Sequence, residues 1–173
     1  MQRRHHCELA FEQHLRRLRL PYIAVDEARK ALLPEGSATD SIKSFDFLVS
    51  TPDRKLVVDV KGRRLRLTRK GTVGRLENWV TQDDLHSMAR WEDLLGAGFE
   101  AVFVFTYWSE HQPPDGMFEH LVECRDRWYA LRTVTLRAYE RHARIRSHRW
   151  ETLDLPTSAF DRMGVPLCAP RCA

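Results

Sequence analysis

The stretch from Ser44 to Arg64, SFDFLVSTPDRKLVVDVKGRR, contains three side chains that could do chemistry together. Apolar residues alternate with others in Ser44–Ser50 and again in Lys55–Lys61, and the segment Thr51–Arg54 between them has residues typical of a turn. The pattern therefore predicts a β-hairpin. If the two central residues of that turn form the loop, Asp46 lies directly opposite Asp59, with Cβ atoms about 5 Å apart. Side chains alternate along a strand, so Lys61 shares a face with Asp59.

Two carboxylates and one ammonium on a single hairpin predict a site for a divalent cation. Carboxylates this close repel each other, and one of them would be pushed to hold its proton. Mg²⁺ removes that cost, because it prefers one or two carboxylates together with waters and phosphate oxygens. A neighbouring lysine can orient or deprotonate a water. The grouping therefore predicts metal-assisted attack on a phosphodiester.

Asp46 and the tripeptide Asp59-Val60-Lys61 resemble the core of the PD-(D/E)xK nuclease superfamily, which includes restriction endonucleases and archaeal Holliday-junction resolvases. Phe45 stands where the first motif of that superfamily often has Pro. The tripeptide alone has low specificity, since about one acidic-x-Lys is expected by chance in a chain of this size. Asp53-Arg54-Lys55 is a second instance, placed in the turn. The hairpin context carries the resemblance.

A helix is predicted from Arg4 to Leu20, with an apolar stripe at helical spacing. Glu8 and Glu12 lie four residues apart and share one of its faces. In the resembled superfamily an N-terminal helix often brings a glutamate to the metal, and the resemblance implies Glu8 for that place. Glu12 is the alternative, and both could also be surface glutamates.

A second helix is predicted to follow Thr81, because Thr81 and Asp84 form a capping-box pattern with Asp in place of Glu. Its apolar stripe extends to about Leu95, and glycines follow. Several branches of the superfamily place a glutamine at the start of this helix beside the catalytic residues. That resemblance implies Gln82 as a site residue, and a surface glutamine is the alternative.

The segment Lys61–Arg75 has seven basic residues and no acidic one, and arginines outnumber acids again between Arg125 and Arg149. Clustered base fits a phosphate-binding surface, and a solvated, ion-paired surface is the alternative. The residues expected to contact nucleic acid are Arg63, Arg64, Arg66, Arg69 and Lys70.

The fold class expected is α/β. Ala101–Tyr107, AVFVFTY, is a continuous apolar run that predicts a strand buried on both faces. Helix, hairpin, helix and buried strand give the order of the resembled core, a restriction-endonuclease-like α-β-β-α-β unit with a central mixed sheet flanked by helices. The elements expected elsewhere are a short edge strand at 22–25, strands at 128–134 and 150–155, and helices at 136–145 and 158–163.

Length and composition bound the remaining expectations. At 173 residues the chain predicts one domain, residues 1–164, followed by a flexible tail, 165–173. The formal net charge of +4 is modestly basic. The four cysteines show no zinc spacing, and neither a signal peptide nor a membrane span is recognisable, so a cytoplasmic protein is expected.

The resemblance assigns a role to each candidate. Asp46, Asp59, the Val60 carbonyl and Glu8 would hold Mg²⁺ or Mn²⁺, and Lys61 would position or activate the attacking water. Gln82 would orient that water or Lys61. The expected function is a metal-dependent endonuclease or exonuclease of the PD-(D/E)xK type that hydrolyses phosphodiester bonds in DNA. DNA is the expected partner, no membrane partner is expected, and a homodimer is left open. A catalytically inactive module that binds nucleic acid or a protein is the alternative, and a purely structural hairpin is the third reading.

Overall fold

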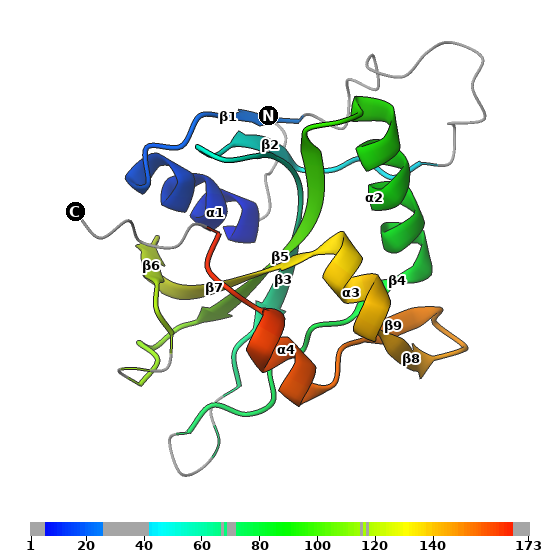
Figure 1. Ribbon diagram of the computed structural model, residues 1–173. Helices are drawn as coiled ribbons and strands as arrows, with labels where there is room; N and C mark the ends of the chain where they lie inside the picture. The colour runs from blue at the N-terminus through cyan, green and yellow to red at the C-terminus, as the bar shows by residue number, and fades with distance from the viewer. Residues whose placement is uncertain are drawn as a thin grey trace.

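A mixed six-stranded sheet forms the centre of the computed structural model, with strand order β1-β2-β3-β5-β7-β6 (Figure 1). The structure describes residues 6–25, 42–66, 68, 72–114, 116 and 118–167. Within the sheet β3 and β5 are parallel, and the other neighbouring pairs are antiparallel. The α/β class and the mixed central sheet expected from the sequence are confirmed.

The elements follow one another along the chain with these bounds. The strands of the large sheet are β1 (Tyr22–Ala24), β2 (Phe47–Ser50), β3 (Lys55–Arg64), β5 (Phe99–Ser109), β6 (Leu121–Cys124) and β7 (Arg127–Thr135). The helices are α1 (His6–Arg17), α2 (Gln82–Leu95), α3 (Leu136–His142) and α4 (Thr157–Met163). A smaller sheet contains β4 (Val80–Thr81), β8 (Arg144–Ser147) and β9 (Thr152–Asp154).

Helices cover both faces of the large sheet, because its central strands are apolar on both sides (Figure 1). On one face, Phe11 and Leu15 of α1 pack with Val58 and Val104. On the other face, α2, α3 and α4 cover a second core, whose central residues include Phe103. In β3, Leu56 and Val58 therefore face α1, whereas Val57 faces α2. The residues that follow Val57 at strand spacing, Asp59 and Lys61, belong to the α2 face.

The hairpin folds in the register expected from its turn. Ser50 pairs with Lys55 and Phe47 with Val58, and the backbone N–H of Asp46 donates to the carbonyl of Val58 at 2.9 Å. The same count along both arms places Asp46 opposite Asp59. Thr51 closes the turn, since its hydroxyl and its backbone N–H both bond to the carbonyl of Arg54 at 2.9 Å.

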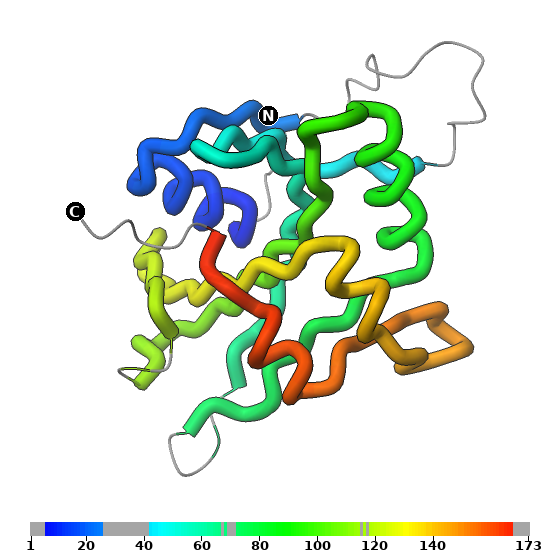
Figure 2. Tube along the Cα trace, in the orientation of Figure 1, coloured from blue at the N-terminus to red at the C-terminus, as the bar shows by residue number. Residues whose placement is uncertain are grey.

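The smaller sheet was not anticipated as a unit. The helix expected at 136–145 ends at His142, and Arg144–Ser147 is a strand instead. This strand forms a hairpin with β9, which in turn pairs with β4 immediately before α2. Figure 2 shows the hairpin (orange) extending away from the large sheet beside α3. The sequence signal was weak because RIRS reads equally well as a polar helix end.

The first residues of the expected C-terminal tail contact the large sheet. Val165 forms a β-bridge with Thr133, with N···O distances of 2.8 and 3.1 Å, and Leu167 is buried. The division into a domain, 1–164, and a flexible tail, 165–173, stays a prediction. Residues 168–173 lie outside the described part of the chain. None of the helices that the structure describes is long and apolar enough to cross a membrane.

Candidate active site

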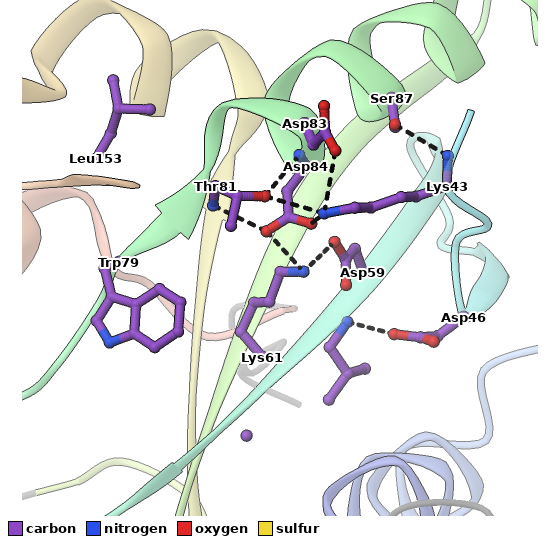
Figure 3. Close-up of polar contacts among 12 residues, drawn as sticks. Lys43, Asp46, Asp59, Lys61, Trp79, Thr81, Asp83, Asp84, Ser87 and Leu153 are labelled. Atoms are coloured by element: carbon purple, nitrogen blue, oxygen red, sulfur yellow. Dashed lines mark hydrogen bonds and ion pairs between the residues drawn. The ribbon is translucent and has the colours of Figure 1, made fainter. Parts of the chain in front are cut away.

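Asp46 stands where β2 separates from β3. Its Oδ2 accepts a hydrogen bond from the backbone N–H of Val60 at 2.6 Å, so the side chain takes the place of the next ladder partner (Figure 3). The N–H and C=O of one strand residue point to the same edge, so the carbonyl of Val60 is directed beyond the end of β2 as well. The strand end thus directs a carboxylate and a carbonyl to one place.

Asp59 and Lys61 are neighbours on the face of β3 that α2 covers. The ammonium of Lys61 lies 2.7 Å from Asp59 Oδ2, and both side chains are more than four-fifths buried. Figure 3 shows the carboxylate of Asp59 directed toward Lys61 and that of Asp46 directed toward the backbone of β3. The structure therefore brings together the two aspartates and the lysine that the hairpin pattern singled out.

Asp84 completes this group, and the sequence reasoning did not include it. It is the third residue of α2 and forms the expected capping box, because its Oδ2 accepts from the N–H of Thr81 at 2.9 Å while its own N–H donates to the Thr81 hydroxyl at 3.1 Å. The same carboxylate lies 3.2 Å from the ammonium of Lys61. A parallel pair needs a crossover, and the helix in that crossover starts near the end of β3, which places Asp84 over Lys61.

Lys43 is the second residue that the sequence reasoning missed. Its ammonium lies 3.0 Å from Asp84 Oδ1 and 3.1 Å from the Thr81 hydroxyl. Its backbone is fixed to the same helix, since its N–H donates to Ser87 Oγ at 3.1 Å and its carbonyl accepts from Trp91 Nε1 at 2.8 Å. The side chain of Lys43 is about half exposed, whereas the carboxylate of Asp84 that it contacts is buried. No sequence pattern marks it, because every contact spans more than thirty residues.

Burial and like charge act on the two hairpin aspartates. Burial and then the charge of Asp59 raise the pKa of Asp46 to about 8, and the N–H of Val60 only partly opposes them. Burial also raises the pKa of Asp59, although Lys61 acts in the opposite direction. These are the electrostatics of a carboxylate pair that a bound cation would relieve.

Lys61 and Asp84 are shifted in the opposite sense. Burial lowers the pKa of Lys61, but Asp59 and Asp84 outweigh it and raise that pKa above its ordinary value. Burial tends to raise the pKa of Asp84, yet Lys61, the capping bond from Thr81 and the bond from Lys43 lower it to about 2. At neutral pH, Asp84 is a fixed anion and Lys61 a fixed cation.

The two glutamates of α1 have different surroundings. Glu12 is buried and bonded, with Oε1 2.9 Å from the guanidinium of Arg16 and 2.7 Å from the hydroxyl of Tyr22. Glu8 is half buried, and its charge acts on Asp46 and raises the pKa of that carboxyl. Glu8 is therefore close enough to Asp46 for its charge to act on that carboxyl.

Gln82 is the first residue of α2, with its side chain exposed. Its backbone N–H donates to the carbonyl of Glu151 at 2.8 Å, so it joins the helix to the smaller sheet. Across the described residues, the contact between this helix and Lys61 comes from Asp84, two positions later. The role expected for Gln82 stays a prediction.

The basic residues expected to contact nucleic acid divide into internal and exposed ones. The guanidinium of Arg63 lies 4.0 Å from the ring of Trp79 and donates to the carbonyls of Gly62 and Trp79. Arg64 and Arg66 are exposed. Arg69 and Lys70 lie outside the described residues.

The donor set suits a hard divalent cation. Two carboxylates and a carbonyl oxygen converge at the end of β2, and Mg²⁺ typically takes one or two protein carboxylates and completes its shell with water and phosphate. Among the described residues no group of three or more His, Cys, Asp or Glu side chains is arranged to hold a metal. A divalent cation at Asp46 and Asp59 would therefore need the carbonyl of Val60 and further oxygens from water or substrate to complete its shell.

The fold is similar to that of a solved Holliday junction resolvase, Hjc from the archaeal hyperthermophile Archaeoglobus fulgidus. The two chains are 14% identical, the match covers 91% of each, and the TM-score is 0.52. The resemblance expected from the sequence is confirmed at the level of the fold. No protein-family profile and no curated protein sequence matches the chain.

Proposed function

We propose that this chain is a metal-dependent nuclease of the PD-(D/E)xK type. The observation that supports this most is the convergence of Asp46, Asp59 and Lys61 at the end of one hairpin, in a fold similar to that of a resolvase. The proposal adds a reaction to that fold, the hydrolysis of a phosphodiester bond.

The protein would hold Mg²⁺ or Mn²⁺ through Asp46, Asp59 and the carbonyl of Val60. Glu8 would contribute from α1, through a water. The bound ion would supply Lewis-acid chemistry and neutralise charge on the phosphate. Both carboxylates are held in one orientation before an ion binds. The N–H of Val60 fixes the rotamer of Asp46, and Lys61 fixes that of Asp59.

Lys61 acts as a charged hydrogen-bond donor in this proposal. Two carboxylates keep its ammonium protonated, so it is suited to bind a phosphate oxygen, position the attacking water and stabilise the negative charge that develops. Asp84 is a positioning residue, since it touches Lys61 and belongs to the rigid first turn of α2. Gln82 is proposed to orient the water from the same helix start.

DNA is the proposed substrate, since the structural neighbour is a Holliday junction resolvase. The exposed arginines Arg64 and Arg66, which continue from the end of β3, would hold the phosphate backbone in register. The homodimer expected by resemblance stays a prediction.

The test is cleavage of labelled DNA with added Mg²⁺ or Mn²⁺. Asp59→Ala and Lys61→Ala should each abolish metal-dependent cleavage while the circular-dichroism spectrum stays that of the wild type. The chain supplies a matched control, because Asp53 and Lys55 repeat the same tripeptide pattern in the exposed turn region. Asp53→Ala and Lys55→Ala should cleave like the wild type. Cleavage that persists in both site variants would refute the assignment.

A module that binds nucleic acid without cleaving it is the second candidate. It is favoured by the way Asp59 and Asp84 already hold the ammonium of Lys61, as in a purely structural ion-pair network. The same assay separates the two candidates. DNA binding with no metal-dependent product in the wild type would favour the second one.

A further inference from the structure

The hairpin of β8 and β9 carries an open aromatic surface at its tip. Trp150 is 68% exposed, and the guanidinium of Arg149 lies 5.3 Å from the centre of its ring. Ile145 on β8 is 53% exposed. An exposed indole with a guanidinium beside it combines a flat apolar face with a positive charge, the two features that single-stranded nucleic acid uses.

The arginines of this hairpin are of two kinds. Arg144 is neutralised, because its Nε lies 3.0 Å from a carboxylate oxygen of Asp154. Arg146 and Arg149 instead lie over indole rings, and neither forms an ion pair with a carboxylate in the parts of the chain that the structure describes. Glu151, the exposed residue after Trp150, is the one acid in the turn that joins the two strands. The tip therefore keeps a net positive charge, carried by two guanidinium groups that lie over rings rather than against a carboxylate in the described chain.

The tip is joined to the candidate active site by backbone and by rings. Strand β9 pairs with β4, and the carbonyl of Glu151 accepts from the N–H of Gln82 at the start of α2. Two guanidinium groups lie near the ring of Trp79, that of Arg63 at 4.0 Å and that of Arg146 at 5.3 Å from the ring centre. Arg63 follows Lys61 by two positions on β3 and so shares its face of the strand. Cations and rings thus continue from the strand of Lys61 to the hairpin.

We propose that this hairpin binds DNA outside the catalytic residues by stacking an unpaired base on Trp150. Arg146 and Arg149 would contact the phosphates on either side of that base. An exposed indole offers a flat face that an unstacked base can cover, whereas the bases of an intact duplex are already stacked on their neighbours. The choice of DNA rests on the proposed function. The surface thus selects DNA with a single-stranded segment over a blunt duplex.

Binding in EDTA tests this without cleavage. Fluorescence anisotropy would compare a labelled single strand, a duplex with a single-stranded overhang, and a blunt duplex. Trp150→Ala should weaken binding of the single strand and the overhang about tenfold, since stacking on one aromatic ring has an effect of that order. Trp150→Phe should restore most of it, and binding to the blunt duplex should change little.

A charge test runs in parallel. Arg149→Gln should weaken binding and reduce the log–log salt slope by about one. Arg17→Gln removes an exposed arginine from α1, on the other face of the sheet, and should leave the preference for unpaired DNA unchanged. The quenching of tryptophan fluorescence by the single strand should be smaller in Trp150→Phe than in the wild type.

Three results would overturn the proposal: equal affinity of Trp150→Ala and wild type for every DNA, an equal loss on blunt duplex and single strand, or no DNA binding by the wild type. These outcomes are separable from the proposed function. Cleavage that depends on Asp59 with no effect of Trp150 would defeat only this proposal. Stacking at Trp150 without any metal-dependent cleavage would defeat only the nuclease assignment.

Discussion

One carboxylate, that of Asp84, has two duties in this molecule. It closes the capping box of α2 with Thr81, and it holds the ammonium groups of Lys61 and Lys43. The helix start and the candidate catalytic lysine are therefore stabilised by the same atoms. Disturbing the cap should displace the lysine, and disturbing the lysine should loosen the cap.

Asp84→Ala should lower the free energy of unfolding by about 2 kcal/mol, through the lost cap and the lost charged hydrogen bonds. Urea denaturation followed by circular dichroism measures it. The matched control is Asp83→Ala, because Asp83 is mostly exposed and lies 3.8 Å from Lys43. That change should stay within about 0.5 kcal/mol. Equal losses in both variants would contradict the role given to Asp84.

Asp46→Asn should weaken Mg²⁺ binding at least about tenfold, because a neutral amide replaces one of two carboxylates that the ion prefers. Isothermal calorimetry without DNA measures it. Asp53→Asn, in the exposed turn, is the control and should bind Mg²⁺ like the wild type. An unchanged titration of Asp46→Asn would remove that residue from the metal site.

At this scale the sequence predicted what the hairpin alone determines. Asp46, Asp59 and Lys61 come from a two-strand count with a fixed period, and the structure has them in that register. Asp84 and Lys43 reach the same place through the crossover helix and the segment packed on it. No local pattern encodes such a long-range contact, so these two residues could not be predicted.

Among the elements, α1 is held to the sheet partly by a buried histidine. His14 is 5% exposed, and its ring lies 5.8 Å from that of His120. Burial, then His120 and Arg17, lower the pKa of His14 to about 4. The helix therefore packs with an uncharged imidazole, and protonation of that ring opposes the packing.

The contribution of His14 to the stability of the fold should consequently depend on pH in the acid range. The pKa of His14 is about 4 when folded against an ordinary 6.5 when unfolded, so between these values this residue binds more protons in the unfolded chain. Its contribution to stability falls by about 2 kcal/mol from pH 7 to 5, while the raised pKa of Asp46 acts in the opposite direction in wild type and variant alike. Urea unfolding of wild type and His14→Gln at both pH values isolates the His14 part. The stability of the wild type relative to the variant should fall by that amount from pH 7 to 5, and an unchanged difference between the two proteins would contradict the account.

Elements with strong local signals were predicted well. The capping pair at Thr81 and Asp84 gave the start of α2, and the apolar run gave β5 as a buried central strand. Strands β6 and β8 were missed because each has only four residues and is defined by its pairing with a partner strand. Pairing is a property of two segments, so one segment alone does not reveal it.

For the whole molecule, the basic segment Lys61–Arg75, which begins at the end of β3, is the feature with a measurable global effect. If about five residues of Lys61–Arg75 contact phosphates, the logarithm of the DNA-binding constant should fall against the logarithm of salt concentration with a slope near −4.5. Anisotropy titrations between low and physiological salt give the slope. A value near zero would exclude these residues from backbone contacts. Arg63, bonded to Trp79, is expected to add least.

The overall architecture followed from the order of elements up to Tyr107. A helix, an antiparallel hairpin, a crossover helix and a continuous apolar strand leave few arrangements, because right-handed crossovers dominate. The part after Tyr107 was less predictable. Its strand β7 pairs antiparallel with β5, and the chain then continues into the smaller sheet. These partners depend on which strand edges the earlier part of the fold leaves unpaired.

The register of the hairpin has a consequence for how this protein can change over generations. Surface turns usually vary in length among related proteins. Here every residue of β3 is paired with β5, so a residue inserted into the turn would change the position of β2 and not that of β3. One added residue between Thr51 and Arg54 would shift Asp46 out of line with Asp59, and two would move it a full pleat away. The amino acids of this loop can therefore vary, but its length cannot. Related proteins should keep four residues between Ser50 and Lys55.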